Sequence, residues 1–355
     1  MTKNSALDKV IAKINKKLGD DMIVVASEVV DYGRITTGSL ALDVALGGGW
    51  AMNKWHEIIG EQSNGKTALA LKTIAANQKK NPDFTTIWVA AEDWVPSHAE
   101  MCGVDSSRVH VITTNILEVA LDAVIEITET KEIDCIVIDS LPALLTTSEE
   151  EKEMGDAIVG KTALQLNKFW RKINFSSQRS VLGGDRPFLG IVINQFRSKI
   201  GVMYGDPRTT PGGEGKNYHF ATRLEVKRDD WVTYGTIQVG DKSEARKVGQ
   251  TIKVRVIKNK TAVPAQVAVF DFYFDDSDMF KAGEIDYIKE AMALAKLFKV
   301  VKRAGAYYRY AERQWQGESA MIASLREEID LQEMLDKDIR EAIKISSKFV
   351  ASDEE

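Results

Sequence analysis

The sequence has little cysteine: of its 355 residues, only Cys102 and Cys135 are cysteines. They lie far apart and have no cysteine or histidine at metal-ligand spacing, so we expect two reduced, buried thiols and neither a disulfide framework nor a zinc site. The chain also lacks an apolar run of the about 20 residues that cross a bilayer. Its N-terminus contains lysines but no apolar core like that of a signal peptide. We therefore expect a cytoplasmic protein that does not contact a membrane.

A strong charge of either sign is also missing, because the formal net charge is only −5. No global basic field indicates nucleic acid, so a nucleic-acid partner would have to be held by local basic loops. With 44% hydrophobic and 28% charged residues, the composition is that of a globular protein. The length suffices for one large domain with appendages or for two domains, and no repeat or low-complexity segment is present.

The middle of the chain alternates short β-rich runs with helical patterns. The runs are "HEIIG", "TTIWVAA", "VHVIT", "CIVIDS" and "FLGIVINQ", and the helical patterns cover 66–80, 116–130 and 157–175. Such alternation predicts an α/β fold, with a mainly parallel sheet that has helices on both faces. After residue 220, "TRLEVKR", "TIKVRVIKN" and "VAVFDFYF" follow one another without long helices, which predicts an antiparallel extension of the same sheet.

The two ends of the chain have helical patterns of their own. Residues 6–18 form an amphipathic pattern with lysines opposite the apolar positions, which predicts a helix. Near the C-terminus we expect a helix over 284–298, a short hairpin in "GAYYRYAERQW" and amphipathic helices over 318–349. We divide the chain into an N-terminal helical segment (1–33), a large α/β core (34–279), a small C-terminal α+β domain (280–349) and an acidic tail (350–355).

The stretch "GEQSNGKTAL" has the pattern of a phosphate-binding loop. Gly60, Gly65, Lys66 and Thr67 fit G-x-x-x-x-G-K-[ST], between a predicted strand and a predicted helix. In such a loop, backbone N–H groups and the helix N-terminus surround phosphate oxygens, the lysine neutralises them, and the threonine hydroxyl binds Mg²⁺. The alternative is a chance match on a glycine-rich turn, which the surrounding strand and helix disfavour.

Two acidic residues at predicted strand ends complete an ATPase pattern. Asp139 follows the apolar run of "IDCIVIDS", where a carboxylate would hold the water shell of the metal. Glu92 ends "TIWVAAED" and would orient the attacking water, although a surface acid at a strand end is the simpler alternative. The residues alone therefore predict an α/β protein that binds Mg²⁺ and ATP and hydrolyses the ATP.

Several stretches, taken in order, resemble the bacterial RecA recombinase family and its phage relatives. They are "ITTGSLALDVALGGG", "GEQSNGKTAL", "AAED", "IVIDSLPALL", "EMGDAIVGK", "INQFRSKIGVMYGDPRTTPGGEGKNYHFATRLEVKR", "VIKNKTAVP" and "AGAYYRY". The resemblance as a whole runs from about residue 6 to 318, in the order of the family. No single motif is unique to the family, but the ordered set is specific. The resemblance implies a RecA-like P-loop NTPase core, and the divergence of the sequence suggests a phage-encoded member.

The resemblance assigns roles to individual residues around the nucleotide. It implies Glu92, Lys66 and Gln195 as catalytic residues, with Gln195 sensing the γ-phosphate, and Thr67 and Asp139 as metal ligands. Lys258 and Lys260 would reach the ATP of the neighbouring subunit. The implied ATP-binding residues are Gly60, Glu61, Gln62, Ser63, Asn64, Gly65, Lys66, Thr67, Ala68 and His98.

The resemblance also implies two DNA-binding loops, at about 149–162 and 196–216. Arg197 and Lys199 offer contacts to phosphates, and Met203 and Tyr204 could insert between stacked bases. On composition alone, an ordinary glycine-rich surface loop is the alternative. The full set of implied DNA-binding residues is Gly160, Lys161, Arg197, Ser198, Lys199, Ile200, Gly201, Val202, Met203, Tyr204, Gly212 and Gly213.

The sequence departs from the family pattern at several positions. Leu164 stands where an arginine is common, and Asn217 stands where a lysine is usual, with Lys216 one position earlier. His98 and Ala282 stand where aromatic residues are common near the adenine. The connection 174–187 is longer than usual, and its arginines have no assigned contacts.

The leading hypothesis is an ATP-dependent DNA recombinase that forms helical filaments on single-stranded DNA and pairs it with homologous double-stranded DNA. Single-strand binding and mediator proteins would be further partners. A ring-shaped helicase on the same core and a nucleotide-gated DNA-binding regulator are the alternatives. The helix at 6–18 would pack either on the next subunit or on its own core, and the acidic tail would either compete with DNA or stay solvated.

Overall fold

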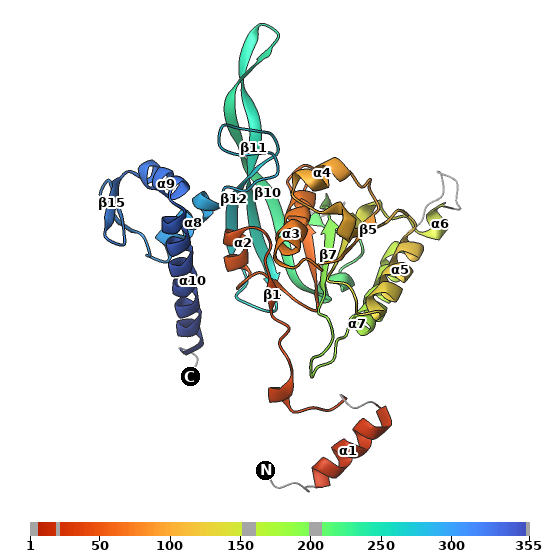
Figure 1. The fold of residues 1–355 in the computed structure, drawn as a ribbon. Coiled ribbons are helices and arrows are strands. Elements are labelled where there is room, and N and C mark those ends of the chain that lie inside the picture. Colours follow the sequence, from red (N-terminus) through yellow and green to blue (C-terminus); the bar gives the residue numbers. More distant parts are fainter. Residues whose placement is uncertain (1–5, 19–21, 151–160, 199–207, 353–355) are drawn as a thin grey trace.

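The computed structural model describes residues 6–18, 22–150, 161–198 and 208–352 (Figure 1). Its helices are α1 (Ala6–Leu18), α2 (Leu40–Ala45), α3 (Lys66–Lys80), α4 (Pro96–Met101), α5 (Leu117–Glu129), α6 (Thr147–Glu150), α7 (Lys161–Ser176), α8 (Tyr287–Leu297), α9 (Glu318–Glu327) and α10 (Ile329–Ser352). Its strands are β1 (Arg34–Ile35), β2 (Trp50–Ala51), β3 (Lys54–Ile59), β4 (Thr86–Ala90), β5 (Val109–Ile112), β6 (Cys135–Asp139), β7 (Leu189–Asn194), β8 (Arg197–Ser198), β9 (Arg208–Thr209), β10 (Phe220–Val239), β11 (Lys242–Asn259), β12 (Val267–Tyr273), β13 (Lys302–Ala304), β14 (Tyr307–Tyr310) and β15 (Arg313–Gln316). Within these residues, no helix is both long enough and apolar enough to cross a membrane.

One large sheet organises the core of the protein. Its strand order is β12-β11-β10-β3-β7-β6-β4-β5. The strands from β10 to β5 pair in parallel, whereas β11 and β12 add antiparallel pairs at one edge. The predicted mainly parallel sheet with an antiparallel extension is confirmed. Because β3, β7, β6 and β4 are neighbours, their carboxyl ends lie side by side at one edge of the sheet.

Both faces of this sheet are covered, as the apolar strand runs predict. Along β6, Val137 packs into the cluster under α3, whereas Ile136 and Ile138 pack into the cluster under α5 and α7. Successive side chains of a strand point to opposite faces, so a strand buried on both sides reads as an unbroken apolar run. Cys102 and Cys135 are buried free thiols, as expected.

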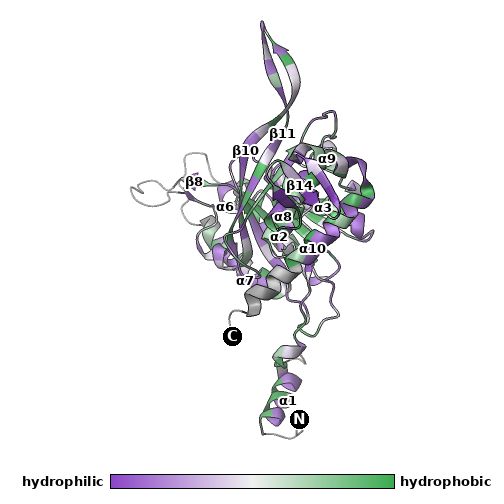
Figure 2. Cartoon of the chain, turned by 90° about the vertical axis from the view of Figure 1, so that its left-hand side faces the viewer, coloured by the Kyte–Doolittle hydropathy of each residue, from purple (hydrophilic) through white to green (hydrophobic). Residues whose placement is uncertain are grey.

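The hairpin formed by β10 and β11 is longer than the sequence predicts. The predicted strands "TRLEVKR" and "TIKVRVIKN" are only its base, and the paired strands continue to Val239 and Lys242. This outer part stands away from the body in two perpendicular views (Figures 1 and 2). Near its tip, the side chains of Tyr234, Ile237 and Val239 are 45–50% exposed. This part of the hairpin therefore does not pack on a hydrophobic core.

The N-terminal helix α1 lies apart from the rest of the described chain (Figures 1 and 2). Leu7 is 66% exposed and Val10 is 52% exposed, so the apolar face of the predicted amphipathic helix is not folded back on its own core. Asn15 exchanges two hydrogen bonds with the backbone of Ile23, which joins the helix to the start of the following linker.

The C-terminal part has a core of its own. Helices α8, α9 and α10 pack with the three-stranded sheet β13-β14-β15 around residues such as Met292, Met321 and Leu335. The predicted hairpin is confirmed as β14 and β15, and β13 adds a third strand that we did not predict. Leu40 from α2 belongs to this same cluster, so the C-terminal core is continuous with the edge of the large α/β core.

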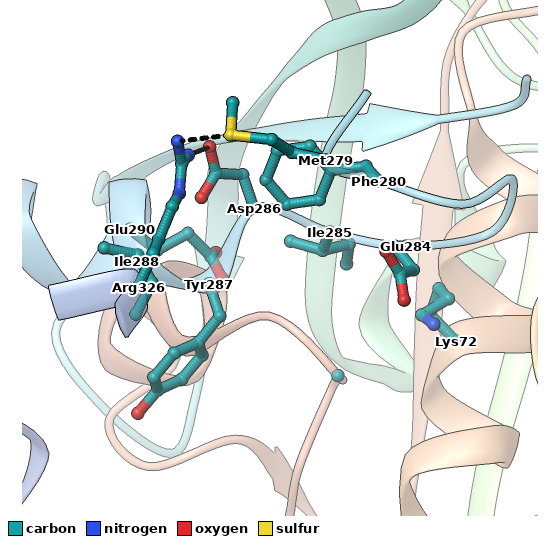
Figure 3. Close-up of a pocket in the computed structure, with 11 residues that line it drawn as sticks. Lys72, Met279, Phe280, Glu284, Ile285, Asp286, Tyr287, Ile288, Glu290 and Arg326 are labelled. Carbon is teal, nitrogen blue, oxygen red and sulfur yellow. Dashed lines mark hydrogen bonds and ion pairs between the residues drawn. The ribbon is translucent and has the colours of Figure 1, made fainter. Parts of the chain in front are cut away.

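A cavity of about 590 Å³ lies at this junction (Figure 3). Beside it, the carboxylate of Glu290 on α8 accepts hydrogen bonds from the Ser39 hydroxyl and from the backbone N–H groups of Leu40 and Ala41 at 3.2 Å. Glu290 therefore caps the N-terminus of α2. Its burial raises its pKa to about 8, because desolvation outweighs the hydrogen bonds that lower it.

The buried Glu290 carboxyl makes the free energy of unfolding depend on pH. The pKa in the folded state, about 8, lies above the ordinary value of 4.5, so the folded state retains a proton that the unfolded chain loses between these values. The free energy of unfolding should therefore fall as pH rises across that window, by at most about 1.4 kcal/mol per pH unit from this group. We expect Glu290→Gln to remove this contribution in urea unfolding at pH 5 and pH 8. The exposed Glu312→Gln is the control, and an unchanged pH slope in the Glu290 variant would contradict the assignment.

Candidate functional site

The phosphate loop lies at the carboxyl edge of the sheet, between β3 and α3. Gly65 has φ +88° and immediately precedes α3, a conformation that favours glycine. A Cβ on Gly60 would lie 2.3 Å from the carbonyl oxygen of Val226, and one on Gly65 would lie 2.6 Å from Ile252. Close packing against the backbone of β10 therefore requires a glycine at position 60, whereas the positive φ angle favours a glycine at position 65.

Lys66 and its neighbours have the positions that the motif predicts. The Lys66 side chain is buried, and its Nζ donates a hydrogen bond to the carbonyl oxygen of Glu61 at 2.6 Å. Burial lowers the pKa of Lys66, and the charges of Asp139 and Glu92 oppose this shift. Among the other predicted nucleotide contacts, Asn64 and Ala68 are buried, whereas Glu61, Gln62 and Ser63 are exposed.

Thr67 and Asp139 lie in contact, as expected for two ligands of one metal ion. The Thr67 hydroxyl donates to the Asp139 carboxylate at 2.9 Å. Burial raises the pKa of Asp139 to about 6. Hydroxyl and carboxylate oxygens are donors that suit Mg²⁺, and this metal usually takes its remaining ligands from phosphates and water. The described residues contain no group of three or more His, Cys, Asp or Glu side chains that could hold a metal without a nucleotide.

Glu92 is fixed beside Asp139. Its carboxylate accepts a hydrogen bond from the hydroxyl of Ser140 at 2.6 Å, and the backbone N–H groups of Ala91 and Glu92 donate to the carbonyl of Asp139. Ser140 was not predicted as a site residue, although it directly follows the Walker B acid. Gln195 follows β7, which lies between β3 and β6, and its backbone N–H donates to the Asn194 side chain at 2.9 Å. Lys66, Glu92, Asp139 and Gln195 therefore meet at one edge of the sheet.

His98 lies on α4, at the side of this edge, and is half-buried, which lowers its pKa. The loop that contains Ala282 passes the end of the same helix, because a Cβ on Gly283 would lie 1.8 Å from the carbonyl oxygen of Met101. The two positions at which the family pattern has aromatic residues are therefore close to one another along α4. Contact of either with adenine stays a prediction.

A buried charge cluster next to Gln195 was missed by the sequence analysis. Glu57 on β3 is fully buried and pairs with Lys216 at 3.2 Å and with Arg223 at 2.6 Å, and it accepts from the Asn194 amide at 2.8 Å. Lys216 also donates to the Thr210 hydroxyl at 2.5 Å. The cluster therefore joins the end of β7 to the C-terminal end of the second predicted DNA loop and to β10. The sequence does contain a signal for this cluster, because the acid Glu57 stands within the apolar run "HEIIG".

This cluster yields a stability prediction. Removing Glu57 would leave the buried Lys216 and the partly buried Arg223 without their carboxylate, so we expect Glu57→Ala to lower the free energy of unfolding by about 3–5 kcal/mol. The matched control is Glu328→Ala, which breaks the exposed pair with Arg313 and should cost less than about 1 kcal/mol. Urea denaturation of both variants tests this, and equal losses would contradict it.

The structure also shows where Lys216 lies, the lysine that stands one position before the usual lysine of the family. It is fully buried in its own chain and paired with Glu57, so it is not placed to reach a neighbouring molecule. Asn217 lies next to it, and the Asn217 side chain accepts from Lys216 at 3.0 Å. The backbone carbonyl of Asn217 accepts a hydrogen bond from Lys258.

Lys258 and Lys260 lie away from the phosphate loop of their own chain. Lys258 pairs across the sheet with Arg223, and Lys260 Nζ donates to the carbonyl of Tyr218 at 2.7 Å. Burial and the charge of Lys260 lower the pKa of Lys258 to about 8. Lys260 lines a cavity together with Lys54, the first residue of β3, whereas the phosphate loop follows the last residue of that strand. The two lysines therefore face away from their own nucleotide edge.

Much of the predicted DNA interface lies outside the described residues. This applies to Gly160 in the first loop and to Lys199, Ile200, Gly201, Val202, Met203 and Tyr204 in the second. Lys161 is the first residue of α7, and Leu164 on that helix is 66% exposed. Arg197 and Ser198 form β8, which pairs with β9, so the second loop leaves the sheet through a short two-stranded stem.

The two predicted DNA loops share a common base. Gly212 and Gly213 have positive φ angles, and a Cβ on either would contact Leu166 or Ala163 of α7. Gly215 is similarly close to Asn167. The C-terminal part of the second predicted loop therefore packs on the helix that follows the first loop. A direct contact of these glycines with DNA stays a prediction.

Comparisons with known proteins show what this chain is similar to. The profile of the RecA N-terminal domain family matches residues 5–278. Protein RecA of Lactobacillus acidophilus is 33% identical over 357 residues, which cover 99% of this chain and 92% of that protein. Protein RecA of Aquifex aeolicus is 34% identical over 96% of this chain and 93% of its own length. The crystal structure of the RadB recombinase matches 66% of this chain and 94% of its own, with 18% identity and a TM-score of 0.47. None of these matches tests the expected phage origin.

Proposed function

The chain belongs to the RecA family, and on that premise we propose that it forms helical filaments on single-stranded DNA and exchanges strands with a homologous duplex. It is an ATP-dependent DNA recombinase, an enzyme that hydrolyses ATP in a DNA-dependent manner. The observation that carries the proposal is the meeting of Lys66, Asp139, Glu92 and Gln195 at one sheet edge, next to the base of both predicted DNA loops.

At this edge, each residue has a separate task in ATP hydrolysis. Backbone N–H groups of the loop 60–65 and the N-terminus of α3 surround the phosphates, and Lys66 neutralises their charge. Mg²⁺, held through Thr67 and Asp139, would compensate the charge that develops on the phosphate oxygens. Glu92, oriented by the Ser140 hydroxyl, positions the attacking water and accepts its proton.

The γ-phosphate would control the DNA loops through Gln195. This residue lies between the nucleotide edge and β8, the first strand of the stem of the second loop. Its neighbour Asn194 donates to Glu57, which pairs with Lys216 and Arg223 behind the same loop. We infer that contact of Gln195 with the γ-phosphate favours the DNA-binding arrangement of the loop and that hydrolysis releases it.

Lys258 and Lys260 would complete the site of the adjacent subunit. Because they face away from their own phosphate loop, their ammonium groups are available to stabilise charge on a nucleotide that the next subunit presents. Hydrolysis would then require assembly. DNA would be gripped mainly through its phosphates, by Arg197, Lys199 and backbone groups, so binding should depend strongly on salt and weakly on base sequence.

A strand-invasion assay tests the proposed function. With ATP and single-stranded DNA, the protein should pair with a homologous supercoiled duplex, and a heterologous duplex should give no product. The Lys66→Ala variant, which lacks the phosphate-binding ammonium, should be inactive. Absence of pairing by folded wild-type protein that binds ATP would reject the proposal.

A further inference from the structure

A cavity of about 860 Å³ opens at the end of the sheet opposite the phosphate loop. The linker that follows α1 forms one wall, through Val29 and Val30, and the connection between α7 and β7 forms another, through Arg179 and Val181. Lys260 lines the same cavity. The unusually long connection is therefore part of a surface that also presents a lysine proposed to act on a neighbouring subunit.

The outer part of this connection, residues 177–186, is held in place by ion pairs and hydrogen bonds. Arg186 makes a two-pronged ion pair with the buried Asp134, with distances of 2.6 and 2.7 Å. Asp185 pairs with Lys131 at 2.9 Å and accepts from the backbone N–H of Ser180 at 2.6 Å. Asp185 and Arg186 therefore attach the C-terminal end of segment 177–186 to the core, and the hydrogen bond between Asp185 and Ser180 closes its turn.

Segment 177–186 in turn holds the linker. The backbone N–H of Val30 donates to the carbonyl of Val181 at 2.8 Å, and the Tyr32 hydroxyl donates to the carbonyl of Ser180 at 2.7 Å. The linker is therefore fixed against this segment before it continues to α1, which stands away from the body (Figure 1).

The cavity carries positive charge at its mouth. Arg179 is 6% exposed, its Nε donates to the carbonyl of Arg186, and its guanidinium lies over the Phe188 ring at 5.1 Å, so this arginine belongs to the wall and is not open to a second molecule. Lys54 and Lys260, by contrast, are exposed, and the only acid among the described residues that line the cavity is Asp31. The mouth of the cavity therefore suits an acidic group from outside the chain.

Apolar side chains surround the same opening. Tyr218, which lines the cavity, is 77% exposed, and Val29 and Met22 are 49% and 59% exposed. Leu182 at the turn of segment 177–186 is 45% exposed. Basic groups within a ring of exposed apolar side chains are typical of a protein–protein contact.

We propose that segment 177–186 and the linker form an additional subunit contact, whose cavity receives a carboxylate from the nucleotide-bearing edge of a second copy of this chain. The inference rests on the proposed function, because it places this face against the neighbour that Lys260 would serve. Charge complementarity supports the choice of partner: the phosphate-loop edge presents the exposed acids Glu61 and Glu100. The exposed Lys54 would pair with one of these acids.

Leu182→Asp tests this contact without disturbing the fold, because Leu182 is partly exposed. DNA-dependent ATPase activity is measured over a range of protein concentrations, with filament sedimentation as a second readout. A charge introduced into an assembled interface should raise the half-saturating concentration by about tenfold or more. The rate at saturation and nucleotide binding by dilute protein should stay unchanged. The control, Val239→Asp at the hairpin tip, has a similar exposure and should behave as wild type.

Lys54→Gln should shift assembly in the same direction, and Lys54→Arg, which keeps the positive charge, should shift it less. If the Lys54 variants do not fold, the Leu182 variant still tests the contact. Assembly curves of Leu182→Asp that coincide with those of wild type would overturn the inference while leaving the recombinase function intact. Wild-type protein that does not assemble on DNA would instead contradict the proposed function itself.

Discussion

Glu92→Gln should lower DNA-dependent ATP hydrolysis by about 10²–10⁴-fold and leave ATP-dependent DNA binding nearly unchanged. The amide keeps the shape of the side chain and can still accept from Ser140, but it cannot take a proton from the attacking water. Lys66, Thr67 and Asp139 are untouched, so the nucleotide should still bind and favour the DNA-binding state. Steady-state phosphate release and single-stranded DNA binding with ATP measure the two effects separately.

Asp93→Asn is the matched control, since it neutralises the neighbouring exposed acid at the same strand end. It should hydrolyse ATP at close to the wild-type rate. If Glu92→Gln turned over normally while Asp93→Asn did not, the catalytic carboxylate would be Asp93. If both variants turned over normally, no acid at the end of β4 would be catalytic.

Replacing both Lys258 and Lys260 with alanine should reduce hydrolysis by assembled protein by about 10³-fold or more, the size of effect seen when a charge supplied by a partner is removed from a phosphoryl-transfer site. Binding of ATP by dilute, unassembled protein should not change, because neither lysine faces the phosphate loop of its own chain. Comparison of turnover with nucleotide binding at low protein concentration separates these effects.

Lys253→Ala is the control for this double variant. Lys253 lies on the same strand, β11, and pairs with the exposed Asp229 at 3.8 Å, so it removes a nearby positive charge without touching the proposed contact. It should retain turnover. Loss of ATP binding by the unassembled Lys258 and Lys260 variant would contradict the assignment, because the lysines would then act within their own subunit.

The residues of the nucleotide edge could be predicted because each of them lies in a short, contiguous sequence motif. Gly60 to Thr67 need a strand, a turn and a helix in direct succession, and Glu92, Asp139 and Gln195 each follow an apolar strand. Parallel strands bring such residues to one edge whatever the connections between them. The order of motifs then identified the family, which assigned roles that the spacing alone left open.

Other features were not predictable because they depend on partners distant in sequence. In the sequence, Lys216 stands one position before the usual lysine of the family, but the fold buries it against Glu57, which also pairs with Arg223. The hairpin beyond residue 228 mixes polar and apolar positions without a core to cover, so its pattern predicts no strand (Figure 2). The contacts of Arg179 and Arg186 require that the connection 174–187 fold against the linker and the core.

The central claim is that each nucleotide site is shared between two subunits, and mixing two inactive variants tests it most directly. Chains with Glu92→Gln supply normal lysines, and chains with Lys258→Ala and Lys260→Ala supply a normal Glu92. In a mixed filament of equal parts on single-stranded DNA, about one quarter of the sites should combine both, so hydrolysis should recover to roughly that fraction of the wild-type rate. A mixture that stays as inactive as its components, although both chains are present in the filaments, would contradict the account.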